Sequence, residues 1–379
     1  MSEPSRHAVA ARYVFDGFMV HENAAIVVEG ARIIAVVPRA DLPGNLRLQA
    51  VPNGAWLAPG FIDLQVNGGG DALFNDSPTA ETIAHIAGAH RKFGTTALLP
   101  TFISDTPAKM AAALAAVQEA ADAQPGVLGI HLEGPFLSSA KAGAHDPRAI
   151  RAPTDEDETH LAKPRKGLIL LTLAPEELPP AFLARQARRG IRLALGHSMA
   201  TYAQTQQAMA EGLTGFTHLF NAMRPMSARE GGPIAAALES PDAWYGLIAD
   251  GVHVDPAMLR LALRGRGRPV LVTDAMPPVG GSRSSFQLYD QEITVQGDRC
   301  VREDGVLAGS ALTMAKAVRN SVRWLEVTLP EALRFASFNP ASVLGLGHVL
   351  GQLTPGFRAD MVAFDPDSVE VLATWVAGK

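Results

Sequence analysis

Short apolar segments recur through the middle of the chain, and each is followed by residues with a helical pattern. Eight of these segments are nearly continuous in apolar residues, as parallel strands buried on both faces should be. They are GFIDLQV from Gly60, TTALLPTF from Thr95, GVLGIHLEG from Gly126, LILLTLAPE from Leu168, IRLALGHS from Ile191, GFTHLFNAM from Gly215, YGLIADGVHV from Tyr245 and RPVLVTDAM from Arg268. Strands that alternate with helices in this way predict an α/β fold in the form of a closed (β/α)₈ barrel. An open parallel sheet is the alternative architecture.

The segments between the predicted strands carry the signals of helices. Ser77 and Pro78 provide a cap and a proline suited to the first helical position. The segment KMAAALAAVQEAADAQ from Lys109 is rich in alanine, and TYAQTQQAMAE from Thr201 is also helical in pattern. We expect PEALRFASFNPASVLGL from Pro330 to form a last helix that closes the barrel.

The two ends of the chain have a different pattern. Residues 8–37 contain short alternating segments interrupted by glycine and asparagine, which favours an antiparallel meander, and residues 350–378 resume that style. We therefore expect a small β-sandwich domain built from both termini, with the TIM-like barrel between them. The segment 277–309 should form a loop and a hairpin inserted after the eighth strand. The expected boundaries are 1–58 plus 346–379 for the β domain and 59–345 for the barrel.

Composition narrows the possible partners. The chain has 379 residues, of which 47% are apolar, which is enough for a full-sized core. The formal net charge is −5 and no extended run of lysine and arginine occurs, so neither a nucleic-acid nor a membrane partner is expected. The N-terminal residues are too polar for a signal peptide, and no apolar segment reaches the length of a membrane span. Cys300 is the single cysteine, which excludes an intrachain disulfide. We expect a cytoplasmic protein.

Polar side chains stand at the ends of the predicted strands. Seven of the eight segments end in, or just before, a residue that can bind a metal, form a hydrogen bond or move a proton. These residues are Gln65 and Asn67, Thr101, Glu133, His197, His218, Asp250 with His253, and Asp274. The fourth segment ends at Pro175 and Glu176 and gives no clear candidate. Because the C-terminal strand ends of a barrel face one mouth, we expect these side chains to converge there.

Glu133, His197 and His218 form a candidate set of metal ligands. Two imidazoles and one carboxylate suit zinc, with a fourth position left for water, and ferrous iron is the main alternative. Singly, each residue has a simpler interpretation, since a lone histidine is commonly a hydrogen-bonded core residue and Glu133 could begin a turn. Together, at the ends of the third, fifth and sixth strands, they favour a metal site.

Three further residues could take part in chemistry. Asp274 ends the eighth strand, where a carboxylate beside a metal-activated water can take a proton and return it to a leaving amine. Its alternative role is to cap the following segment. His145 and His253 lie on the loops after the third and seventh strands, where each could contact substrate or could be a surface histidine.

The segment from Asn221 to Arg229 could bind a phosphate group. Backbone N–H groups at a helix start, at Asn221 and Ala222, together with an arginine would provide such a site. A solvated surface arginine is the commoner alternative. The glycines at 68–70 match neither a dinucleotide-binding motif nor a phosphate-binding loop, and we assign them only to a turn.

The motifs as a group resemble those of a known family. They are PGFIDLQVNGGG, HLEGPFLSSAKAGAH, LGHS, GFTHLFNAM, ADGVHVD, VTDAM and LAGSALTM. This set is similar to that of the N-acetylglucosamine-6-phosphate deacetylases of the amidohydrolase superfamily. The resemblance extends from about residue 59 to residue 314 and includes the flanking β domain. The combination of HLEGP and THLFNAM is its most specific part.

The resemblance implies roles for individual residues. A metal would be held by Glu133, His197 and His218, with Asp274 as the acid/base, and His145 would polarise the acetyl carbonyl. The implied substrate-binding residues are His145, Asn221, Ala222, Arg229, His253, Leu307, Ala308, Gly309 and Ser310. The implied reaction is the deacetylation of N-acetylglucosamine 6-phosphate to glucosamine 6-phosphate and acetate. It also implies a homodimer, in which loops near the phosphate site could be shared between subunits.

The first strand departs from the superfamily pattern. Superfamily members with two metals carry His-x-His there, whereas this chain has Gln65 and Asn67, as part of the deacetylase family also does. Neutral amides are weak ligands for zinc or iron, so we expect one divalent ion per chain, with Gln65 and Asn67 bound to water or to the pocket wall. Three alternatives remain: another amidohydrolase acting on cyclic amides or N-acyl amino acids, a non-haem iron oxygenase, and an inactive interaction protein.

Overall fold

The computed structural model describes residues 6–163 and 165–379. The described chain forms two compact units. The terminal unit comprises the residues up to 63 together with 90–97 and 313–379, and the barrel unit comprises 64–89 and 98–312. The domain boundaries expected from the sequence stay a prediction.

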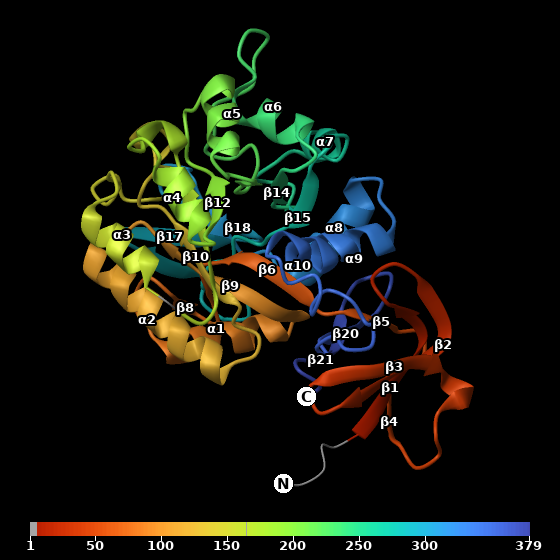
Figure 1. Ribbon diagram of the computed structural model, residues 1–379. Coiled ribbons are helices and arrows are strands. Elements are labelled where there is room, and N and C mark those ends of the chain that lie inside the picture. Colours follow the sequence, from red (N-terminus) through yellow and green to blue (C-terminus); the bar gives the residue numbers. More distant parts are fainter. Residues whose placement is uncertain (1–5, 164) are drawn as a thin grey trace. The chain divides into compact units, whose positions relative to one another are not determined.

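Eight parallel strands form the barrel sheet, in the hydrogen-bonded order β15-β14-β13-β12-β11-β10-β9-β6 (Figure 1). Their bounds are β6 Phe61–Val66, β9 Thr95–Ile103, β10 Gly129–Glu133, β11 Leu168–Leu173, β12 Arg192–Leu195, β13 Gly215–Phe216, β14 Trp244–Leu247 and β15 Arg268–Leu271. A parallel bridge between Val66 and Ala275 joins the two ends of this order and nearly closes the barrel. Each strand coincides with one of the predicted apolar segments, and the continuous burial of β6 and β9 explains why those segments do not alternate.

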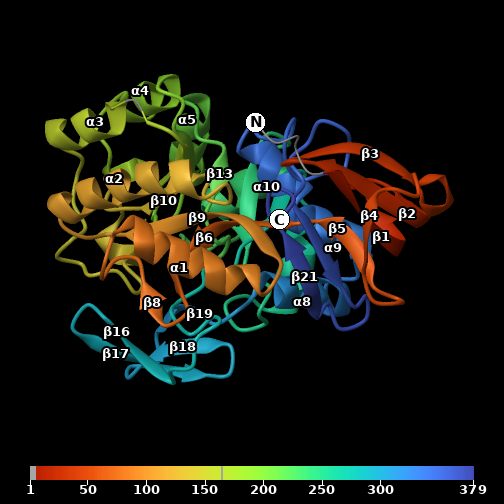
Figure 2. The same ribbon diagram turned by 90° about the horizontal axis from the view of Figure 1, so that it is seen from below.

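Helices cover the outer side of the strands, as α2, α3 and α4 show in Figures 1 and 2. The helix bounds are α1 Ala80–Arg91, α2 Pro107–Ala123, α3 Asp155–Ala162, α4 Phe182–Arg188, α5 Tyr202–Ala210, α6 Gly232–Glu239 and α7 Pro256–Ala262, with short 3₁₀ helices at Arg39–Asp41, Ser139–Lys141 and Pro175–Glu177. Thr201 begins α5 with a capping box, because its hydroxyl accepts from the Gln204 N–H and the Gln204 side chain accepts from the Thr201 N–H. None of the helices in the described part of the chain is long and apolar enough to cross a membrane.

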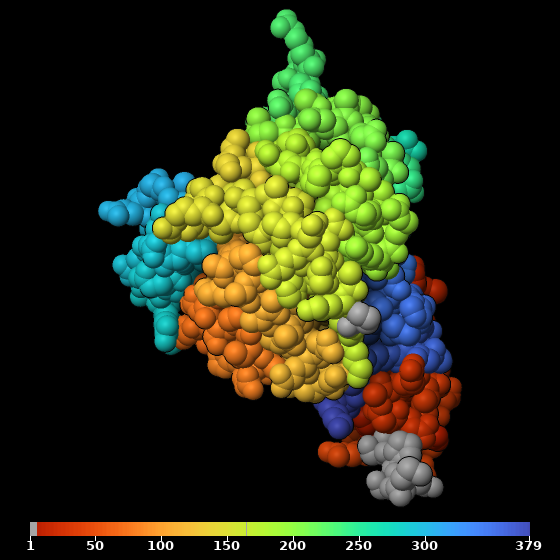
Figure 3. Space-filling model, turned by 60° about the vertical axis from the view of Figure 1, so that its left-hand side comes forward, coloured from red at the N-terminus to blue at the C-terminus, as the bar shows by residue number. Residues whose placement is uncertain are grey.

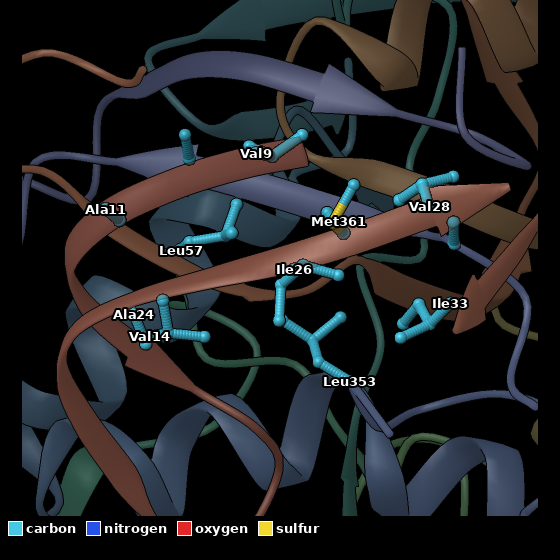
Figure 4. Close-up of a cluster of buried hydrophobic side chains, with 12 residues drawn as sticks. Val9, Ala11, Val14, Ala24, Ile26, Val28, Ile33, Leu57, Leu353 and Met361 are labelled. Atoms are coloured by element: carbon cyan, nitrogen blue, oxygen red, sulfur yellow. The ribbon is translucent and has the colours of Figure 1, made fainter. Parts of the chain in front are cut away.

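The terminal unit contains a seven-stranded mixed sheet, in the order β21-β20-β5-β1-β2-β3 with β4 paired to β1. The bounds are β1 Arg6–Phe15, β2 Val20–Glu29, β3 Arg32–Pro38, β4 Arg47–Ala50, β5 Trp56–Pro59, β20 Met361–Phe364 and β21 Val371–Trp375. Strands from both ends of the chain bury a common apolar cluster that includes Val9, Ile26, Leu57 and Met361 (Figure 4). The predicted fold class, a (β/α)₈ barrel with a small β domain built from both termini, is confirmed, and the described strands of the expected β-sandwich belong to this one mixed sheet.

The predicted single last helix is wrong in detail. Two helices occupy this segment, α9 Leu329–Ala336 and α10 Phe338–Val343, separated by Ser337. Pro340 explains the interruption, since it has no N–H to donate to the Ala336 carbonyl and its ring would crowd that oxygen. Both helices, with α8 at Met314–Trp324, belong to the terminal unit.

The insertion after the eighth strand is larger than a hairpin. It forms a four-stranded antiparallel sheet, visible as a separate layer in Figure 2. The bounds are β16 Ser285–Leu288, β17 Gln291–Gln296, β18 Arg299–Arg302 and β19 Leu307–Ser310, and a small pair, β7 Gly68–Gly69 with β8 Ala72–Leu73, lies in the same unit. Phe286, Ile293 and the buried Cys300 pack with Ile103 and Met276 of the barrel into one apolar cluster. This packing brings β19 to the barrel mouth.

Candidate active site

Glu133, His197 and His218 converge at the C-terminal ends of β10, β12 and β13, and all three side chains are buried. Glu133 Oε1 lies 3.1 Å from His197 Nε2 and 2.9 Å from His218 Nε2, and the two Nε2 atoms are 3.2 Å apart. If both imidazoles are neutral and donate from Nε2 to the shared Glu133 oxygen, neither Nε2 has a lone pair left to accept at the contact between the two rings. Ligand atoms around a tetrahedral zinc ion, at bond lengths of 2.0–2.1 Å, are separated by about 3.3 Å. The donor set therefore fits a divalent cation.

The positions of the protons on His197 and Glu133 also suit a bound cation. His197 Nδ1 donates to the Lys141 carbonyl at 2.7 Å, which leaves the Nε2 lone pair directed at Glu133. Burial alone would raise the pKa of Glu133, but the hydrogen bonds and charges of His197 and His218 lower it well below its usual value. The carboxylate is thus ionised and available as a ligand.

The backbone is strained where these side chains leave the strands. His197, His218 and Asp274 have φ angles of 49°, 32° and 51°, in the left-handed region that costs a non-glycine residue about 1–3 kcal/mol. Each of the three residues lies two or three positions beyond the end of its strand, at Leu195, Phe216 and Leu271. The sharp turn directs the side chains into the mouth instead of along the strand.

Asp274 is held by the two amide side chains of the first strand. Asn67 Nδ2 donates to Asp274 Oδ1 at 2.7 Å, and Gln65 Nε2 donates to the same oxygen at 3.1 Å and to Glu133 Oε2 at 3.1 Å. Burial and then the charge of Glu133 raise the pKa of Asp274 to about 6. Gln65 and Asn67 thus present N–H donors to these carboxylates. Among the residues described, Glu133, His197 and His218 are the one group found with the geometry of a metal site.

His145 reaches the same mouth from the loop after β10. Its ring lies close to that of His197, with centroids 4.4 Å apart, and its Nδ1 is 2.9 Å from the Ser104 hydroxyl. Burial, followed by the charge of His197, lowers the pKa of His145 to about 3. The ring is therefore a neutral imidazole at physiological pH.

His253 is oriented by Asp250. His253 Nδ1 donates to Asp250 Oδ2 at 2.6 Å, and Asp250 Oδ1 accepts the N–H groups of Val252 and His253. Burial would raise the pKa of Asp250, but the hydrogen bond from His253 lowers it below the usual value. An ionised carboxylate thus fixes the His253 ring at the pocket wall.

The backbone at Asn221 and Ala222 differs from the expected helix start. These residues lie in a turn, with the Asn221 N–H bonded to the His218 carbonyl at 3.0 Å, and the next helix begins only at Gly232. The prediction of a helix N-terminus here is wrong, because Asn221 turns back onto His218 directly after the strand. Both residues nevertheless line the pocket.

One pocket of about 260 Å³ contains most of the predicted site residues. Those that line it are Asn67, Glu133, His145, His197, His218, Asn221, Ala222, His253, Asp274, Leu307, Ala308 and Gly309. Gly309 has a φ of 64°, and a Cβ there would stand 2.5 Å from the Met276 side chain, so glycine is required. Ser310 is not part of the lining; its hydroxyl donates to the Thr273 carbonyl at 2.6 Å beside Asp274. Gln65 lies behind the lining, against Glu133 and Asp274.

Arg229 lies away from the pocket. It is exposed, on a thin loop between β13 and α6 that projects from the barrel unit (Figures 1 and 3). An antiparallel β-bridge between Ser227 and Glu230 forms the turn that contains Arg229. The structure therefore does not bring Arg229 together with the other candidate residues of the same chain.

Sequence reasoning missed several residues of the site. One is Glu176, in the 3₁₀ helix that follows the fourth strand, which accepts hydrogen bonds from the Ser198 hydroxyl at 2.7 Å and from the Met199 N–H and so supports the turn after His197. The apolar lining was also missed because such side chains carry no chemical signal. The missed apolar residues are Ile103, Ala144, Ile248, Met276, Leu288 and Val306. Ile103 is the last residue of β9 and Ile248 directly follows β14, so their places at strand ends could have indicated them. Leu288 and Val306 come from the insertion.

Comparison with known proteins gives consistent matches. The model of the amidohydrolase family matches residues 56–379. The chain is 43% identical to the N-acetylgalactosamine-6-phosphate deacetylase of Shewanella sp. (strain ANA-3) over 85% of this chain and 82% of the relative. The crystal structure of N-acetylglucosamine-6-phosphate deacetylase from Pasteurella multocida superposes with a TM-score of 0.95 at 36% identity, covering 98% of both chains. A mutant of the enzyme from Mycobacterium smegmatis, in complex with N-acetyl-D-glucosamine-6-phosphate, superposes with a TM-score of 0.88 at 32% identity and 99% coverage of both chains.

Proposed function

The chain belongs to the amidohydrolase family and is an amino-sugar-6-phosphate deacetylase, and from this premise we propose that its substrate is N-acetylglucosamine 6-phosphate. The observation that carries the proposal is the buried cluster of Glu133, His197 and His218 with Asp274 on the wall of the same pocket. These four residues supply what amide hydrolysis requires, a cation site and a proton acceptor beside it. The products are glucosamine 6-phosphate and acetate.

We propose that Glu133, His197 and His218 hold one zinc ion, with ferrous iron as the alternative. Such an ion supplies Lewis-acid chemistry, which lowers the pKa of a water molecule and polarises a carbonyl. Asp274 Oδ1 is engaged by Asn67 and Gln65, so Oδ2 takes the proton of the attacking water. Asp274 then delivers that proton to the sugar nitrogen as the amide C–N bond breaks. His145 stabilises the acetyl oxygen as it becomes negative.

The sugar phosphate is proposed to bind at the part of the pocket that Asn221, Ala222 and His253 line. Asn221 and Ala222 would face the phosphate and sugar, and His253, oriented by Asp250, would donate or accept a hydrogen bond there. Leu307, Ala308 and Gly309 would enclose the acetyl methyl group, since they bring small or apolar surface to the mouth. Ser310 would support the backbone next to Asp274, because its hydroxyl donates to the Thr273 carbonyl.

Arg229 is not among the residues that line the pocket of its own chain. Because it is exposed on a projecting loop outside its own pocket, we propose a homodimer in which this loop enters the site of the partner subunit. The substitution Arg229→Ala should then weaken substrate binding by roughly 1.5–3 kcal/mol, the value of a charge-assisted hydrogen bond. Steady-state kinetics should show a KM raised roughly 10- to 150-fold. An unchanged KM would contradict the assignment.

Mixed dimers test whether Arg229 acts in the partner's site. A dimer of one Arg229→Ala chain and one Asp274→Asn chain has one site with its own Asp274 and the arginine of the other chain. If the loop is shared, that site works and the mixed dimer has about half of the wild-type activity. If Arg229 serves its own site, the mixed dimer is no better than the two variants alone.

The substrate itself is tested by acetate release from a panel of acetylated sugars. We expect kcat/KM for N-acetylglucosamine 6-phosphate to exceed that for N-acetylglucosamine by roughly 10- to 150-fold or more, since the unphosphorylated sugar lacks the charged group. Equal values would remove the phosphate-site assignment. N-acetylgalactosamine 6-phosphate is the second candidate, favoured by the 43% identity to the Shewanella enzyme. A higher kcat/KM for that sugar would replace our substrate by its 4-epimer.

A further inference from the structure

His145 is held at one ring nitrogen by Ser104, the residue that directly follows β9. The Ser104 hydroxyl lies 2.9 Å from His145 Nδ1, and the Ser104 backbone N–H points at the same nitrogen at 3.3 Å. A backbone N–H can only donate, so Nδ1 has to accept. An imidazole whose Nδ1 accepts a hydrogen bond carries its proton on Nε2.

The other ring nitrogen is free to serve the pocket. Within residues 6–163 and 165–379, His145 Nε2 makes no hydrogen bond to protein, and the ring lines the pocket beside His197. The Nε2 proton can therefore be donated to an acceptor that enters the pocket. The opposite tautomer would present a lone pair to a developing oxyanion and would repel it.

Ser104 is in turn fixed by residues from two other segments. Tyr289, between β16 and β17 of the insertion, donates its hydroxyl to the Ser104 carbonyl at 2.6 Å. Asn75 binds both backbone groups of the preceding residue, Ile103, accepting its N–H at 3.0 Å and donating to its carbonyl at 3.1 Å. Gly134 leaves the space that the Ser104 hydroxyl fills. Ser104 thus has little freedom to move away from His145.

We propose that Ser104 and Tyr289 are positioning residues for the deacetylation. Ser104 sets His145 in the tautomer with a proton on Nε2, and Tyr289 holds Ser104 in the place where it can do so. This inference rests on the proposed function, in which His145 stabilises the acetyl oxygen. It gives the four-stranded insertion a role in orienting His145 in addition to covering the pocket.

The tautomer can be measured directly. The ¹⁵N chemical shifts of histidine in zinc-loaded, ¹⁵N-labelled protein distinguish a protonated from an unprotonated ring nitrogen, and the His145→Gln variant identifies the His145 signals by their loss. We expect Nε2 to be protonated and Nδ1 unprotonated at neutral pH. A ring protonated on Nδ1, or on both nitrogens, would overturn the proposal.

Kinetics of matched variants test the positioning role. Ser104→Ala and Tyr289→Phe should each lower kcat roughly 3- to 10-fold, the effect of one lost hydrogen bond, with KM changed less than about twofold because the interaction matters in the transition state. Ser104→Thr keeps a hydroxyl and should retain most of kcat. Tyr245→Phe is the control, since it removes a buried tyrosine hydroxyl that donates to the Ala262 carbonyl at 2.8 Å away from the pocket.

The outcomes separate this inference from the proposed function. A kcat in Ser104→Ala and Tyr289→Phe equal to that of Tyr245→Phe would refute the positioning role. Wild-type protein that releases no acetate from any sugar of the panel would refute the proposed function, while the ¹⁵N measurement would still decide the tautomer. A His145 ring protonated on Nδ1 in an active enzyme would refute only the role of Ser104 and Tyr289.

Discussion

Replacing Asp274 by asparagine is expected to lower kcat roughly 10²–10⁴-fold while the substrate still binds. The change keeps the size of the side chain and the oxygen to which Asn67 and Gln65 donate. It removes the basic oxygen that takes the proton of water and later protonates the sugar nitrogen. The loss should therefore appear in kcat, because the proton is transferred in the transition state and not on binding.

Two measurements check this result. Steady-state acetate release gives kcat, and calorimetric titration of the slow variant with N-acetylglucosamine 6-phosphate gives Kd. Asp255→Asn is the matched control, since Asp255 caps α7 by accepting the Ala257 N–H at 2.7 Å and asparagine caps helices equally well. It should retain the wild-type kcat. A kcat near the wild-type value in Asp274→Asn would remove Asp274 from its assigned role.

Removal of the metal is expected to abolish acetate release, and one equivalent per chain is expected to restore it. Ligand atoms of Glu133, His197 and His218 form one cluster. Gln65 and Asn67 direct N–H groups at Asp274 and so offer no pair of ligand atoms to a second ion. A second ion would need basic ligands at the first strand, which neutral amides do not supply. Without the ion, water is not activated and the carbonyl is not polarised, so acetate release should be lost.

Metal analysis and binding titration measure the stoichiometry without relying on activity. After loosely bound ions have been removed, the wild-type chain should bind one zinc ion, and His197→Ala and His218→Ala should bind none tightly. His348→Ala is the control, because this histidine is exposed in the terminal unit and should leave binding unchanged. If activity required a second equivalent, our interpretation of Gln65 and Asn67 would be wrong.

The sequence predicted those parts of the site that depend on local pattern. Glu133, His197, His218 and Asp274 each follow an apolar segment whose continuous hydrophobicity marks a buried parallel strand. The topology of a barrel then requires their side chains to share one mouth, whatever their distance along the chain. The interruption at Ser337 was also within reach of the sequence, since Pro340 contains the reason for it.

Other features depended on how separate segments pack. Arg229 has the same sequence character whether its loop folds over its own pocket or projects from the unit, and only the structure shows that it projects. Likewise Ser104, Tyr289 and Glu176 carry no motif, and their contacts with His145 and with the turn after His197 appear only once the insertion and the loops are in place.

The sequence by itself therefore determined the barrel, the terminal β unit and the residue types at the strand ends. Only the tertiary structure decided which loops reach the pocket, which tautomer His145 adopts and where Arg229 lies. The physical reason is that strand burial leaves a periodic record in the residues of the strand itself. A loop contact is instead fixed by hydrogen bonds between single residues far apart in the chain, and such pairs leave no pattern in either segment.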